Sequence, residues 1–84
     1  MDRHEAVLKI LTKHIKLNVD GLEHTEIRPE KSMVDYGASS LDIVEIVSAA
    51  MRELKIKIPR TELAKVKNIG QLVDLFVAVE QAPA

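Results

Sequence analysis

Apolar residues recur every three or four positions in three separate stretches of the chain. The stretches cover residues 3–17, residues 40–54, and a last segment that begins at residue 69 and ends before Pro83. This spacing is typical of helices that bury one face, and a shorter helix is expected over residues 61–66. No alternating strand pattern is clear, so we predict an all-α fold: a small four-helix bundle of three main helices and one short helix. The apolar positions of the three stretches are Val7, Leu8, Ile10, Leu11 and Ile15; Ile43, Ile46, Val47, Ala50 and Leu54; and Ile69, Leu72, Val73, Leu75, Phe76 and Val79.

A polar residue that can cap the helix stands at the start of each predicted helix. In the first helix, Glu5 follows the cap by three residues, which is the capping-box position, and Gln71 stands in the same relation to the last cap. The expected caps are Asp2, Ser39, Thr61 and Asn68.

A long loop of about 22 residues, 18–39, is expected between the first two main helices, because it holds Gly21, Pro29 and Gly37. Loops of this length in small domains normally pack against the core or carry function. We expect a short helical turn near residues 29–33. The apolar residues expected to anchor the loop to the core are Val19, Leu22, Ile27 and Met33.

The helix over residues 40–54 carries a second, weaker apolar line. At about 100° per residue, Leu41 lies nearly opposite the main stripe. The second line is either a contact surface for a partner, or Val44 and Met51 simply widen the buried stripe. Its members are Leu41, Val44, Ser48 and Met51.

Length and composition indicate one globular domain, residues 1–84, with 46% hydrophobic and 30% charged residues. No apolar run approaches the ~20 residues that cross a bilayer, and the N-terminus does not resemble a signal peptide, so no membrane role is expected. We expect a monomer, and a cytoplasmic location, which fits the absence of cysteine. The chain has no cysteine, so thiol chemistry would need an imported thiol.

The net charge of −1 conceals two blocks of opposite sign. Residues 20–53 hold eight acids and three bases, a formal charge of −5, whereas residues 55–67 hold five bases and one acid, a charge of +4. Most single charges are expected to be solvated surface, but the segregation suggests an acidic face beside a basic face that can orient partners.

Several function classes have no support in the sequence. The three histidines, at positions 4, 14 and 24, lack metal-ligand spacing, and we expect them on the surface. The basic segment has no interleaved aromatic residues, so nucleic-acid binding is not expected. The chain has no Gly-rich phosphate loop and no motif-supported catalytic triad, so no catalytic residue and no metal site are predicted.

Ser40 stands out because it follows a flexible turn and begins a long helix. A hydroxyl at a helix N-terminus is a favourable place for an anionic group, since free N–H groups and partial positive charge meet there. Ser39 is able to supply the cap, so Ser40 is not needed for it. Serine is nevertheless common at helix starts, and a purely structural role is the alternative.

The segment Gly37-Ala38-Ser39-Ser40-Leu41-Asp42-Ile43-Val44-Glu45 resembles the prosthetic-group motif of acyl carrier proteins, Gly-x-Asp-Ser-Leu followed by an acidic residue and then Val-Glu. The likeness in length, helix order and the Ile58-Pro59 pair covers essentially the whole chain. It implies a non-catalytic carrier with 4′-phosphopantetheine on Ser40, loaded from coenzyme A by a separate magnesium-dependent phosphopantetheinyl transferase. It also assigns partner contact to Leu41, Asp42, Val44 and Glu45.

Two departures from the family pattern narrow the expected function. Ser39 replaces the usual Asp, and Arg60 with neighbouring lysines makes the region after the Ile-Pro pair basic. The chain therefore looks more like a discrete polyketide carrier than a fatty-acid carrier, and a β-branching pathway is a plausible subclass. The resemblance then implies acyltransferase, ketosynthase or hydroxymethylglutaryl-synthase-like partners. The alternatives are a fatty-acid or peptidyl carrier, and an unmodified helical protein-binding adaptor.

Overall fold

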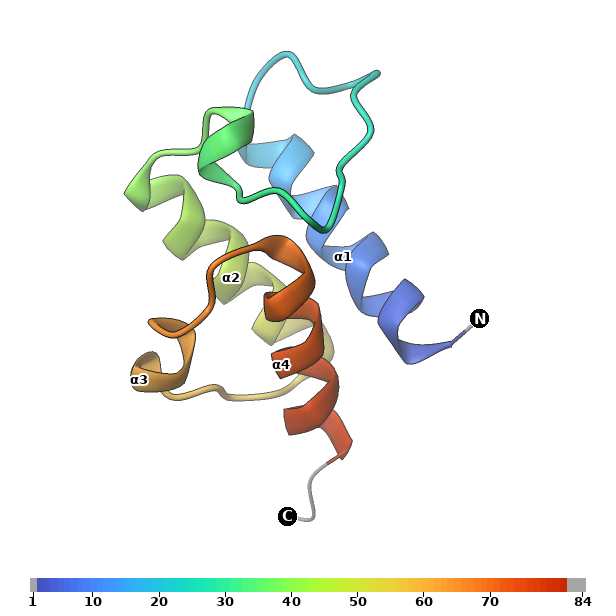
Figure 1. Cartoon of the computed structure of the whole chain (residues 1–84), viewed down its shortest axis with the longest axis vertical. Coiled ribbons are helices and arrows are strands. Elements are labelled where there is room, and N and C mark those ends of the chain that lie inside the picture. Colours follow the sequence, from blue (N-terminus) through green and yellow to red (C-terminus); the bar gives the residue numbers. More distant parts are fainter. Residues whose placement is uncertain (1, 82–84) are drawn as a thin grey trace.

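The computed structural model describes residues 2–81, and within that range it contains helices and no strand, which confirms the predicted all-α bundle (Figure 1). Three helices are long, one is a single turn, and a 3₁₀ helix lies in the long loop. Pro83, which we expected to mark the end of the last helix, lies outside the described residues. The elements are α1 (Arg3–Asn18), η1 (Val34–Tyr36), α2 (Ser40–Leu54), α3 (Arg60–Leu63) and α4 (Ile69–Gln81).

The core lies where α1 packs against both α2 and α4 (Figure 1). Its largest side chain is Phe76 of α4, which is fully buried. Burying a large apolar side chain contributes roughly 1.5–3 kcal/mol to the free energy of unfolding, so each such side chain is important for the stability of the bundle. The other large and fully buried side chains are Val7, Leu11, Ile15, Ile46 and Ile69.

The long loop packs against the core, as predicted. All four expected anchors, Val19, Leu22, Ile27 and Met33, are at most 9% exposed. The hydroxyl of Tyr36 adds a polar cross-link, because it accepts a hydrogen bond from the N–H of residue 28 at 2.8 Å and donates one to the carbonyl of residue 26 at 3.2 Å. The loop is therefore a fixed part of the fold.

The helical turn expected near residues 29–33 lies a few residues later, at Val34–Tyr36. Only a single hydrogen-bonded turn forms at residues 28–31. The later position follows from Ser32 and Asp35: the Ser32 N–H donates to the Asp35 carboxylate at 2.9 Å, and the Asp35 N–H donates to the Ser32 hydroxyl at 3.3 Å. This reciprocal pair fixes where the chain begins to coil.

Helix α3 begins and ends earlier than expected. We predicted residues 61–66 with Thr61 as the cap, but the helix covers Arg60–Leu63 and Pro59 is its N-cap. The proline ring fixes φ near the helical value, and the Pro59 carbonyl accepts hydrogen bonds from the N–H groups of Glu62 (3.0 Å) and Leu63 (3.2 Å). Thr61 thus lies inside the turn.

The start of α4 is capped by Asn68, as predicted. Its side-chain oxygen accepts a hydrogen bond from the Gln71 N–H at 2.8 Å. The Gln71 side chain reaches back one residue further than a capping box requires, and accepts from the Lys67 N–H at 2.8 Å.

The long loop supplies two further partners to the start of α4. The Ile69 N–H donates to the Lys31 carbonyl at 2.9 Å, and the Gly70 N–H donates to the Pro29 carbonyl at 2.8 Å. A Cβ at residue 70 would lie 3.3 Å from that Pro29 oxygen, so glycine permits the close approach. We call these two hydrogen bonds the loop latch.

An ionic cluster joins α1 to the end of α2. The Glu53 carboxylate lies 2.7 Å from the Lys13 ammonium and 2.9 Å from Nε2 of His14. The hydrogen bond from Lys13, and then that from His14, lower the pKa of Glu53 below its ordinary value. The surface position expected for the histidines is wrong for His14, whose side chain is only 14% exposed.

We expect Glu53→Gln to lower the melting temperature at pH 7 and to lower it less at pH 3. A carboxylate with a depressed folded-state pKa stabilises the protein above its unfolded pKa, and this contribution is lost as the pH falls through the folded value. Thermal unfolding at both pH values measures the effect, with Glu23→Gln, on the exposed loop, as the control. An equal loss at pH 3 would show that packing, not charge, explains the result.

Candidate functional site

The chain turns sharply just before α2. Gly37 has φ of +91°, a left-handed conformation that glycine adopts without a steric penalty, and its N–H donates to the Val34 carbonyl at 2.9 Å. Ala38 is buried, and its N–H donates to the Met33 carbonyl at 3.2 Å. The turn therefore closes the 3₁₀ helix and fixes the direction in which α2 begins.

Ser39 is the N-cap of α2, as predicted, and forms a complete capping box with Asp42. The Asp42 N–H donates to the Ser39 hydroxyl at 3.2 Å, and the Ser39 N–H donates to the Asp42 carboxylate at 2.9 Å. The box replaces the charged cap of the family pattern, so the helix start keeps its hydrogen bonds and an acidic group.

Ser40 is left available by this arrangement. Its side chain is exposed and makes no hydrogen bond within residues 2–81, because Ser39 and Asp42 cap each other. The N–H groups of Ser40 and Leu41 lie in the first turn of α2 and have no partner in the described part of the chain. An accessible hydroxyl beside free N–H groups suits a phosphodiester, so the residues present fit a phosphopantetheine group.

The first turns of α2 expose large apolar side chains. Leu41 is 81% exposed and Val44 is 61% exposed, and the acidic Glu45 beside them is exposed as well. Val44 therefore does not widen the buried stripe. Met51, by contrast, is half-buried and packs against the core. The second apolar line is therefore exposed at its beginning and joins the interior at its end.

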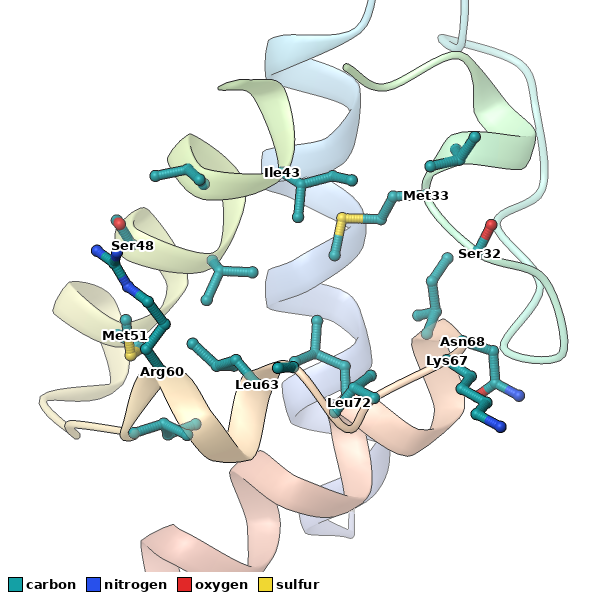
Figure 2. Close-up of a pocket in the computed structure, with 17 residues that line it drawn as sticks. Ser32, Met33, Ile43, Ser48, Met51, Arg60, Leu63, Lys67, Asn68 and Leu72 are labelled. Carbon is teal, nitrogen blue, oxygen red and sulfur yellow. The ribbon is translucent and has the colours of Figure 1, made fainter. Parts of the chain in front are cut away.

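A groove of about 880 Å³ lies beside α2 (Figure 2). Helix α2 forms one wall, the loop before it and α3 form others, and the segment that begins α4 closes the lower side. Its lining is mainly apolar and includes Ile43, Val47 and Leu72. The groove could not be predicted from the sequence, because its walls come from four segments and the apolar residues of each segment also fit core positions.

Within residues 2–81 the structure brings together no group of acidic and histidine side chains that could hold a metal ion. None of the helices in that range has the length and apolar character needed to cross a membrane.

The fold and the free serine define a helical domain of the kind that carries a prosthetic group. Residues 11–76 match the family model described as the phosphopantetheine attachment site. This match covers most of the chain, including the turn and the whole of α2. The chain belongs to the acyl carrier protein family.

Two relatives are similar to the chain over more than two thirds of its length. The chain is 36% identical over 76 residues, 90% of its length and 92% of the relative's, to the polyketide biosynthesis acyl-carrier-protein AcpK of Bacillus subtilis (strain 168). It is 42% identical over 59 residues, 69% of its length and 77% of the relative's, to an acyl carrier protein of Clostridium acetobutylicum.

A solved structure gives the same result at the level of the fold. The chain matches, with a TM-score of 0.83 and 41% identity, a chain in the crystal structure of the curacin biosynthetic pathway HMG synthase in complex with acetyl donor-ACP. The match covers 93% of this chain and 99% of that chain. The expected membership of the acyl carrier family is thereby confirmed.

Proposed function

We propose that Ser40 carries 4′-phosphopantetheine and that residues 1–84 act as one non-catalytic carrier domain in polyketide biosynthesis of the β-branching kind. The observation that carries the proposal is the exposed Ser40 hydroxyl, which capping leaves unused. When bound, the group supplies a terminal thiol that holds acyl groups as thioesters. A chain with no cysteine has no such thiol of its own.

The residues around Ser40 would anchor the group without taking part in chemistry. The free N–H groups of Ser40 and Leu41 lie at the positive end of the helix dipole and would stabilise a phosphodiester on the Ser40 oxygen. No general base is required in this chain, because a separate magnesium-dependent phosphopantetheinyl transferase would activate the hydroxyl and transfer the group from coenzyme A.

The partner surface is proposed to be the exposed start of α2. Leu41 and Val44 would enter an apolar depression on a visiting enzyme, while Asp42 and Glu45 would pair with basic residues around it. The visitors would be an acyltransferase, a ketosynthase or a hydroxymethylglutaryl-synthase-like enzyme. Similarity to AcpK and to a chain in the HMG synthase complex supports this choice. The carrier would act as a cytoplasmic monomer.

Loading tests the attachment directly. The protein is incubated with coenzyme A, magnesium and a broad-specificity phosphopantetheinyl transferase, and its intact mass is recorded. We expect a mass gain of one phosphopantetheinyl group, located on the peptide that contains Ser40. No gain with several transferases would favour the unmodified adaptor over the carrier.

Charge reversal at Glu45 tests the partner surface. Because Glu45 is exposed, we expect Glu45→Lys to keep its melting temperature and to lower kcat/KM for loading by about tenfold, since a favourable contact becomes a repulsion. The matched control is Glu23→Lys in the exposed loop, which should be loaded at the same rate as the protein without substitutions. Unfolding of Glu45→Lys, or equal loss in both variants, would contradict the assignment.

A further inference from the structure

The groove beside α2 is apolar with positive charge at its rim. Of its 17 lining residues, 12 are apolar and none is acidic, and its charged residues are Arg60 and Lys67. Among residues 2–81 the guanidinium of Arg60 has neither an ion pair nor a hydrogen bond, although Lys65 nearby is paired with Glu62 at 3.4 Å. A ligand with an apolar body and an anionic end would complement this lining.

The two cations differ in direction. In Figure 2, Arg60 extends from α3 toward α2, with its guanidinium at the level of Ser48. Lys67 lies at the other end of the groove in that view, and its ammonium is directed away from the cavity. Of the two cations, Arg60 is therefore the one that is directed toward α2, where a ligand in the groove would lie.

The distance from Ser40 agrees with this placement. Residues 40 and 48 are eight positions apart on α2, a rise of about 12 Å at 1.5 Å per residue. The phosphopantetheine arm has 14 bonds from the serine oxygen to the sulfur atom. Three bonds of an extended chain span ~3.5 Å, so the extended arm is about 16 Å long. Between these points Val44 and Val47 line the groove, so an acyl group held by the arm can lie on apolar wall.

On the basis of attachment at Ser40, we propose that the groove holds short acyl groups ending in a carboxylate, such as malonyl, and that Arg60 selects them. The methylene carbon packs against the apolar wall, and the carboxylate pairs with the guanidinium, whose planar donors match two carboxylate oxygens. Because Arg60 is exposed, the selectivity is that of a surface ion pair, about threefold, and decreases in high salt.

The test compares two acyl groups of similar length. The protein is loaded with the malonyl or the butyryl arm from malonyl- or butyryl-coenzyme A, and intact mass verifies loading. Hydroxylamine then cleaves each thioester, and the rate relative to the free acyl-pantetheine gives a protection factor. We expect Arg60→Gln to reduce the malonyl factor about threefold and to leave the butyryl factor unchanged, and 1 M salt to act like the substitution.

Two control variants separate the site from general charge. Lys57→Gln removes a cation from the same basic segment outside the groove, and Lys67→Gln removes the cation directed away from the cavity; both should keep the malonyl factor. Arg60→Lys should keep part of it, because the charge stays and the two-point contact is lost. A second measurement is the amide chemical shift of Ser48, which should differ between the malonyl and butyryl forms only while Arg60 is present.

The outcomes distinguish this inference from the function on which it rests. Failure of loading on Ser40 would overturn the carrier itself. Normal loading with equal effects of Arg60→Gln on malonyl and butyryl protection would leave the carrier intact and overturn the role of Arg60. Equal losses of malonyl protection in Arg60→Gln, Lys57→Gln and Lys67→Gln would show that the general positive charge of this region, and not a specific site at Arg60, protects the thioester.

Discussion

Ser40→Ala is expected to abolish loading completely and to leave the fold unchanged. The substitution removes the oxygen on which we propose that the group is attached, so the intact mass should show no gain after incubation with coenzyme A and transferase. Its effect on stability should stay within ~0.5 kcal/mol, because the Ser40 side chain is exposed and makes no hydrogen bond within residues 2–81.

The neighbouring serine supplies the matched control. Ser39→Ala removes the capping box with Asp42, which should cost about 1 kcal/mol, or a decrease of roughly 4–8 °C in melting temperature, while loading continues. Opposite effects of two adjacent serines would be hard to explain by a general disturbance of the turn. Loading that persists in Ser40→Ala, or disappears only in Ser39→Ala, would move the attachment to another residue.

Phe76→Ala is expected to cause the largest loss of stability, about 3–5 kcal/mol. Phe76 is fully buried, and it is the largest such side chain in a core that α1, α2 and α4 share. A domain of 84 residues has a free energy of unfolding of roughly 4–13 kcal/mol, at about 0.05–0.15 kcal/mol per residue, so the substitution should remove a large fraction of it. Urea denaturation followed by circular dichroism measures the difference.

Leu75 offers the comparison for Phe76. It precedes Phe76 on the same helix and is half-buried, so Leu75→Ala should cost only about 1–2 kcal/mol. If both substitutions cost the same, the side chain of Phe76 is not the centre of the core. In either variant, the fraction that loads should follow the folded fraction, since both residues belong to α4 and neither lies in the turn before α2 or in α2 itself.

The helices and their caps could be predicted because each depends on residues close together in sequence. Helical spacing located α1, α2 and α4, and the polar residues Asp2, Ser39 and Asn68 cap them as expected. The exposed position of Leu41 also followed from local geometry, since a residue opposite the main stripe cannot face the same core.

Features that depend on distant segments were not predictable in this way. Val77 is buried although the predicted apolar face of α4 does not include it, so that face is wider than the spacing indicates. The groove needs α2, α3, the loop before α2 and the start of α4 at once, and the loop latch joins backbone groups about 40 residues apart. Helix α3 begins earlier than predicted because Pro59, and not Thr61, occupies the N-cap position.

The loop latch gives the molecule an internal reporter. The two amides that it ties, those of Ile69 and Gly70, are protected from solvent exchange only while the carbonyls of Pro29 and Lys31 remain in place. The same loop continues into Ser32 and Met33 on the wall of the groove. Deuterium uptake at these two amides would therefore report, as an average over the molecules in solution, how often that wall opens away from the bundle.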